Sequence, residues 1–63
     1  MAKFRKGNVV ERDSNIDTRK LILCVDEANS YYEYMSLGGR IVGLQTRINI
    51  ELVDKLYERV GES

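Results

Sequence analysis

The chain has to hold its fold together without covalent or metal crosslinks. Its 63 residues include a single cysteine, Cys24, and no histidine. One thiol cannot form an internal disulfide, and a structural zinc site needs a cluster of cysteine and histidine ligands. A domain of this length buries only about 60% of the surface that its unfolded chain exposes. We therefore expect one small domain, residues 1–63, stabilised by its own hydrophobic core or by self-association.

Charge is balanced over the whole chain but not along it. Ten basic and ten acidic residues give a formal net charge of zero. Basic residues dominate the first 20 positions, whereas Asp26, Glu27 and Glu33 make the middle acidic. A strong non-specific nucleic-acid binder usually carries a basic excess, so the balance argues against that function.

The composition also predicts a cytoplasmic protein without a membrane partner. The single cysteine allows no disulfide framework, which fits a reducing compartment. The basic start has no apolar stretch behind it, as a signal peptide would have. No run approaches the roughly 20 apolar residues of a membrane span.

Apolar and aromatic runs separated by turn formers predict an antiparallel meander. The predicted strands are a short one that begins at Val9-Val10 after a turn at Gly7-Asn8, and residues 20–25, 31–35 and 41–45. Their predicted connections are a loop at 13–18, a reversal at 26–30 and a tight turn at 37–40. The pair Gly38-Gly39 tolerates the positive φ angles of a short hairpin loop, so it indicates a turn rather than a phosphate-binding loop.

Two of these strands carry most of the expected core. Five consecutive apolar residues at 21–25 suggest burial on both faces, or one buried face and one covered by a partner. Cys24, inside this run, is then a buried small hydrophobic side chain. In the next strand we expect Tyr32 and Tyr34 to pack inward, because alternate residues share a face.

The C-terminal segment has two interpretations. In the first, Asn49 caps a full helix over residues 50–60, and apolar residues recur at helical spacing. In the second, residues 51–54 form one helical turn and residues 56–60 form a closing strand. The pattern by itself slightly favours the full helix.

The order of these pieces resembles a known kind of fold. The residues that carry the resemblance are Phe4-x-x-Gly7-x-Val9-Val10, the run 21–26, Tyr31-Tyr32-Glu33-Tyr34, Gly39-Arg40-Ile41 and the run 51–60. They resemble the small SH3-like barrel proteins common among phage and mobile-element accessory genes, in which a short helical turn precedes an edge-closing strand. The resemblance implies a mainly β fold, a small antiparallel SH3-like barrel or meander of four to five strands with one helical turn or short helix near residues 49–55. A full-length C-terminal helix would make the fold α+β instead.

No residue pattern indicates an enzyme, a cofactor or a metal site. Cys24 has no histidine to act as its base. Asp26 and Glu27 are adjacent carboxylates, but a turn in so small a domain offers no deep, dry pocket for acid–base work. We therefore expect a non-enzymatic protein with no cofactor and no metal.

The length and the lack of catalytic groups look like those of phage-encoded anti-CRISPR inhibitors. Such proteins are typically tiny, non-enzymatic and single-domain, and they cover a surface of a CRISPR effector complex. In several cases they present acidic groups where DNA would lie. The resemblance implies a phage or mobile-element protein in the cytoplasm of the host bacterial cell, with a CRISPR effector subunit as its protein partner.

The partner-binding residues that we predict are Asp26, Glu27, Tyr31, Glu33 and Met35. An exposed tyrosine and methionine ringed by charge have the composition of an interface core. The acidic members would dock on a basic surface of the target and block nucleic-acid access. The alternative is that Tyr31 only covers a cross-strand neighbour.

Two other functions stay open on the sequence alone. A small nucleic-acid-binding SH3-like barrel would use basic residues interleaved with aromatic ones, although we expect Phe4 to plug the core. The basic residues for that function are Arg5, Lys6, Arg19, Lys20, Arg40 and Arg47. The third hypothesis is a structural phage module, such as a homodimer in which the long apolar strand at 20–25 pairs with another chain.

Overall fold

The computed structural model describes all residues, Met1–Ser63, and its main element is one five-stranded antiparallel sheet. The strands are β1 (Asn8–Arg12), β2 (Asn15–Asp26), β3 (Tyr31–Ser36), β4 (Gln45–Asn49) and β5 (Tyr57–Glu62). One α-helix, α1 (Ile50–Leu56), and one 3-10 turn, η1 (Gly39–Ile41), complete the fold. The predicted mainly β fold with a single short helix is confirmed. Neither helical segment has the length and apolar character that a membrane crossing requires.

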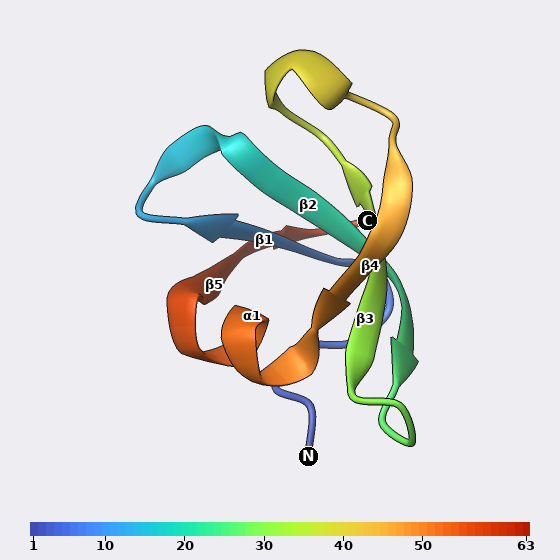
Figure 1. The fold of residues 1–63 in the computed structure, drawn as a ribbon. Helices are drawn as coiled ribbons and strands as arrows, with labels where there is room; N and C mark the ends of the chain where they lie inside the picture. Colours follow the sequence, from blue (N-terminus) through green and yellow to red (C-terminus); the bar gives the residue numbers. More distant parts are fainter.

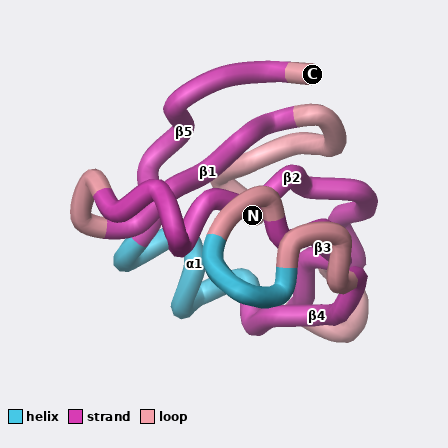
Figure 2. Tube along the Cα trace, turned by 90° about the horizontal axis from the view of Figure 1, so that it is seen from above, coloured by secondary structure: helices cyan, strands magenta, loops and turns pink.

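The strands follow the order β4-β3-β2-β1-β5 across the sheet. Strands β1 to β4 are successive neighbours, and β5 returns to the free edge of β1 (Figure 1). β2 is long enough to pair with β1 along its first part and with β3 along its second part. The strands therefore curve around the interior instead of lying flat, as the view from above also shows (Figure 2).

The interior is a single cluster of side chains from the sheet, the helix and the N-terminal segment. Its buried members are Phe4, Val10, Ile22, Tyr32, Tyr34, Ile50, Val53 and Tyr57. The inward packing of Tyr32 and Tyr34 is confirmed, and Tyr32 is fully buried. Phe4, which precedes β1, is also buried, so its role as a core plug is confirmed.

The connection between β1 and β2 is shorter than predicted. Asp13 and Ser14 have φ angles of 53° and 56°, and Arg12 pairs directly with Asn15. Two consecutive positive φ angles are typical of a two-residue type I′ hairpin turn. The predicted loop at 13–18 is therefore wrong, because β2 already begins at Asn15.

The connection between β3 and β4 is longer than predicted. Residues 37–44 form an irregular segment that contains η1, so the tight turn at 37–40 and the strand at 41–45 are both wrong. Gly38 lies so close to β2 that a Cβ there would be 2.1 Å from the Ile16 carbonyl oxygen. Gly38 thus permits a close approach of the loop to β2 rather than a tight hairpin.

The C-terminal segment follows the second interpretation. Asn49 caps α1, because its Oδ1 accepts a hydrogen bond of 3.1 Å from the Leu52 backbone N–H. The helix ends at Leu56 and β5 begins at Tyr57, so the full helix over 50–60 is wrong. Ending the helix there buries Tyr57 in the core and lets β5 pair with β1.

Candidate partner-binding surface

A bulge in β2 determines which side chains share the outward face of the sheet. Ile22 pairs with Tyr34 and Cys24 pairs with Glu33, so Leu23 is an extra residue on β2. The extra residue shifts the alternation and turns Cys24 outward, where it is exposed. The prediction that Cys24 is buried is therefore wrong. Burial of both faces of this apolar run also fails, because only Ile22 is buried.

Three predicted residues, Asp26, Tyr31 and Glu33, form a continuous surface at the end of the β2–β3 hairpin. We call these three the acidic patch. Asp26 is the cross-strand partner of Tyr31, and Glu33 follows Tyr31 two residues later on the same face of β3. Tyr31 and Glu33 are both half-buried, so each packs partly against its neighbours on the sheet.

Arg47 of β4 lies across the acidic patch. Its guanidinium carbon is 4.8 Å from the centroid of the Tyr31 ring, and its Nε is 3.4 Å from Glu33 Oε1. The Arg47 and Glu33 side chains are 63% and 42% exposed, so this ion pair adds about 1 kcal/mol or less. Two carboxylates against one guanidinium leave the surface with a net negative charge.

Asp26 is held in place by the turn that follows it. The backbone N–H and the Nδ2 of Asn29 donate hydrogen bonds of 3.1 Å and 3.0 Å to the two carboxylate oxygens. These bonds lower the pKa of Asp26, so the group is ionised at neutral pH. Loss of solvent, and then the neighbouring Asp26 carboxylate, raise the pKa of the Tyr31 hydroxyl.

Two predicted residues lie outside the acidic patch. Glu27 accepts a hydrogen bond of 2.7 Å from the Ala2 backbone N–H, so its carboxylate is engaged by the N-terminal segment. Met35 lies at the other end of β3, between its cross-strand partners Leu21 and Gln45. It is half-buried and extends an apolar row rather than the charged surface.

No protein-family model, curated protein or solved structure matches this chain. Only the chemistry of its own residues therefore bears on its function. No group of three or more His, Cys, Asp or Glu side chains is arranged to hold a metal ion. The cross-strand partner of Cys24 is Glu33, and the Glu33 carboxylate forms an ion pair with Arg47. What this face offers a ligand is charge and an aromatic ring.

Half of the basic residues predicted for nucleic-acid binding already have partners within the chain. The Arg19 guanidinium lies 3.4 Å from the buried Glu11 carboxylate. The Lys20 ammonium lies 5.0 Å from the ring centroids of both Tyr34 and Tyr57. Arg47 pairs with Glu33 and lies against the Tyr31 ring of the acidic patch. The remaining three, Arg5, Lys6 and Arg40, form no ion pair.

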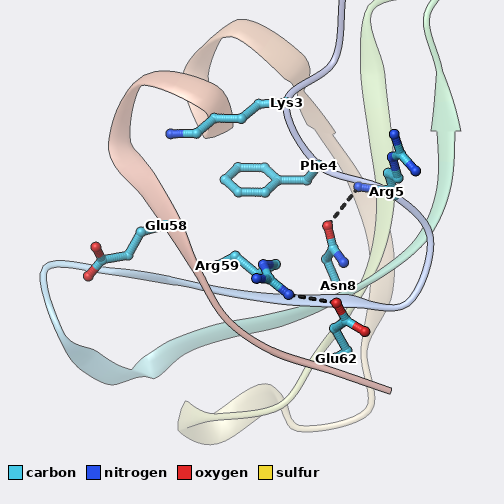
Figure 3. A pocket seen from close by; sticks show the side chains of 7 residues that line it. All are labelled: Lys3, Phe4, Arg5, Asn8, Glu58, Arg59 and Glu62. Atoms are coloured by element: carbon cyan, nitrogen blue, oxygen red, sulfur yellow. Dashed lines mark hydrogen bonds and ion pairs between the residues drawn. The ribbon is translucent and has the colours of Figure 1, made fainter.

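A surface hollow of about 480 Å³ lies between the N-terminal segment and β5 (Figure 3). It is lined by Lys3, Phe4, Arg5, Asn8, Glu58, Arg59 and Glu62. Arg59 and Glu62 neutralise each other at 2.6 Å, and Asn8 accepts a hydrogen bond from the Arg5 backbone N–H. Phe4 is the one apolar residue in the lining and is already buried, so the hollow offers an apolar ligand little contact.

A second hollow, of about 430 Å³, borders the acidic patch. It is lined by Leu23, Glu33, Gln45, Thr46 and Arg47. The bulge in β2 places Leu23 in its lining, beside the charged pair of Glu33 and Arg47. A long side chain of a docked protein can therefore enter next to the acidic patch.

Sequence reasoning missed two residues of this surface. Asn29 had a signal, because Asp26-x-x-Asn29 is the spacing of a side chain that bonds to the backbone of its own turn. Arg47 was predicted only as one of the basic residues for nucleic-acid binding. The strand at 45–49 places Arg47 directly opposite Glu33, and that register was hidden while the strand was expected at 41–45.

Proposed function

We propose that this chain is a non-enzymatic, protein-binding inhibitor of phage or mobile-element origin, similar to anti-CRISPR proteins. In this proposal the acidic patch occupies a basic surface of a CRISPR effector subunit and blocks nucleic-acid access to it. The observation that carries the proposal is the Tyr31 ring flanked by the Asp26 and Glu33 carboxylates on one outward face. An aromatic anchor ringed by charge is the composition of many interface cores.

The groups that would contact the target are already ordered. Asn29 fixes the Asp26 carboxylate, and the Arg47 guanidinium covers the Tyr31 ring. Side chains ordered before binding lose less conformational entropy in the complex. The Glu33–Arg47 ion pair is exposed, so a basic group of the target can compete for the Glu33 carboxylate.

Charge explains how such a surface would exclude nucleic acid. A negative patch steers the protein toward a positive groove and occupies the groups that would otherwise neutralise phosphates. Since the chain as a whole is neutral, this attraction is local to the acidic patch. Binding should therefore weaken with salt, but less steeply than binding of DNA to the same groove.

The C-terminal segment of the fold fits the proposed SH3-like character. The resemblance implies a short helical turn followed by an edge-closing strand. In the chain, α1 occupies seven residues and leads directly into β5, which pairs with the free edge of β1. A small curved sheet of this kind leaves its outward face available for contact.

Charge reversal of the acidic patch tests the proposal. The double variant Asp26→Lys/Glu33→Lys should lose inhibition of DNA binding by purified CRISPR effector complexes at a temperature at which thermal unfolding shows that it is still folded. The matched control is Asp17→Lys/Glu58→Lys, which makes the same charge change at exposed acids outside the patch. Equal inhibition by the two double variants, or no inhibition of any effector by the unaltered protein, would contradict the proposal.

A nucleic-acid-binding barrel is the second candidate. The observation that favours it is that Arg5, Lys6 and Arg40 have no acidic partner in the chain. Titration of labelled DNA and RNA at two salt concentrations decides it, because phosphate contacts make affinity fall steeply with salt. Absence of binding at low salt removes this candidate.

A further inference from the structure

The long apolar strand is an interior strand of the sheet. β2 lies between β1 and β3, and its residues Lys20 and Leu21 pair with both neighbours. A second chain therefore cannot pair along all of residues 20–25, as the sequence-based homodimer would require. The strands at the two ends of the sheet are β4 and β5.

The two open edges differ in how they are protected. β5 carries the charged residues Glu58, Arg59 and Glu62, and a register shift at Val60 interrupts its pairing with β1. Charges and bulges are the usual devices that prevent pairing at a sheet edge. β4 is less protected, since its pairing with β3 has no bulge and Arg47 is its one charged residue.

The hydrogen-bond pattern shows which β4 groups face outward from the edge. Ser36 N–H donates to the Leu44 carbonyl at one end of the β3–β4 ladder, and Ile50 N–H donates to the Ser30 carbonyl at the other. Bonded and non-bonded pairs alternate in an antiparallel ladder. The backbone N–H and C=O groups of Gln45 and Arg47, which lie at the intervening positions, therefore point away from β3 and are free to pair.

We propose that β4 pairs with β4 of a second copy of this chain, which gives a two-fold symmetric dimer with one continuous sheet. The two-fold axis passes beside Thr46. In this register Gln45 of each copy bonds to Arg47 of the other through both backbone groups. A register centred on Arg47 would instead place two like charges directly opposite each other, which is unfavourable.

The side chains of β4 are complementary in the same register. Ile48 lies on the face of β4 that continues the core, and the symmetry places it opposite Leu44 of the second copy, the residue that immediately precedes β4. Leu44 is 48% exposed in the single chain, whereas Ile48 packs against the core cluster. Their cross-strand contact extends the core across the interface. A strand of five residues makes a small interface, so the dimer should form at micromolar to millimolar concentration.

Sedimentation equilibrium of the whole protein tests the dimer. The unaltered chain should show a monomer–dimer equilibrium. Gln45→Pro removes an outward N–H without touching the β3–β4 ladder, and it should weaken dimerisation by about tenfold or more. Gln45→Ala keeps that N–H and should behave like the unaltered chain. A protein that stays monomeric at millimolar concentration, or an equal effect of the two variants, overturns the proposal.

Disulfide trapping tests the register separately from the affinity. In a Cys24→Ser background, Thr46→Cys places the two thiols opposite each other at the axis, within the Cα separation that a disulfide accepts. The control Gln45→Cys places them on a diagonal at about 7–8 Å, which is too far. We expect a covalent dimer for the first variant and not for the second. The reverse result overturns the proposal. Sedimentation masses larger than a dimer would also overturn it, because they would indicate that β4 of one copy pairs with β5 of the next. Neither outcome depends on the proposed inhibitor function.

Discussion

The Tyr32 hydroxyl donates a hydrogen bond of 2.5 Å to Asp54 Oδ1, which ties the centre of the sheet to α1. The same hydroxyl accepts a bond of 3.1 Å from the Phe4 backbone N–H. The second oxygen of Asp54 accepts a bond of 3.0 Å from the Lys3 backbone N–H. A tyrosine on β3 and an aspartate on α1 thus anchor the N-terminal segment that carries the Phe4 plug.

The first prediction concerns the stability of this network. Tyr32→Phe should lower the free energy of unfolding by about 2 kcal/mol, because it leaves the buried Phe4 N–H without an acceptor and removes a bond to a charged group. Urea unfolding measures the change. Tyr34→Phe is the matched control, since no hydrogen bond involves the Tyr34 hydroxyl, and it should change stability by less than about 0.5 kcal/mol. Equal effects of the two variants would contradict the role of the network.

The second prediction concerns alkaline pH. Burial, and then the hydrogen bond to Asp54, raise the pKa of Tyr32 from 10.0 to about 12. Between these values the folded chain holds a proton that the unfolded chain has lost. The free energy of unfolding should therefore fall as pH rises from 10 to 12, and be unaffected by this group below pH 10. Tyr32→Phe should lose this part of the pH dependence, and an identical alkaline profile in that variant would refute the assignment.

The third prediction concerns the close approach of the β3–β4 connection to β2. Gly38→Ala should destabilise the fold by about 1–3 kcal/mol, because its Cβ would collide with the backbone at Ile16 and Asp17. Gly61→Ala is the control, since the nearest atom to a Cβ there is the Val9 side chain at 3.9 Å. Thermal unfolding should separate the two variants. An unchanged stability of Gly38→Ala would mean that the β3–β4 connection does not pack closely against β2.

The fold class was predictable because its signals are local. The apolar run at 20–25 and the aromatic run at 31–35 each fall within one strand, and alternation correctly placed Tyr32 and Tyr34 inside. The hairpin at Asp13-Ser14 was missed because positive φ angles usually call for glycine or asparagine, and this turn has neither. The β4 strand was missed because the apolar residues before it, such as Ile41 and Val42, suggested an earlier strand although they are exposed in the loop.

The candidate surface was only half predictable. Alternation along β3 put Tyr31 and Glu33 on one face, and adjacency across the turn brought in Asp26. Neither signal contains the bulge at Leu23, which depends on how β2 curves between two neighbours and not on local propensity. Glu27 was grouped with the acidic patch by sequence proximity, although its carboxylate is bonded to Ala2.

The fourth prediction concerns the start of α1. Asn49→Ala should lower the free energy of unfolding by about 1 kcal/mol, because it removes the acceptor for the Leu52 N–H. Asn49→Asp keeps an acceptor oxygen and should restore most of the stability. Urea unfolding of the three proteins measures both effects. Equal losses in the two variants would show that the cap contributes nothing.

The fifth prediction concerns Cys24, which the bulge turns to the outward face. A small thiol-reactive reagent should modify it in the native protein at a rate close to that of the urea-unfolded chain, because no unfolding is needed for access. Cys24→Ser should change the free energy of unfolding by less than about 0.5 kcal/mol, since the side chain fills no part of the core. A thiol that reacts only when the chain unfolds would show that β2 pairs with β3 without the extra residue at Leu23. In that register Cys24 would return to the buried face.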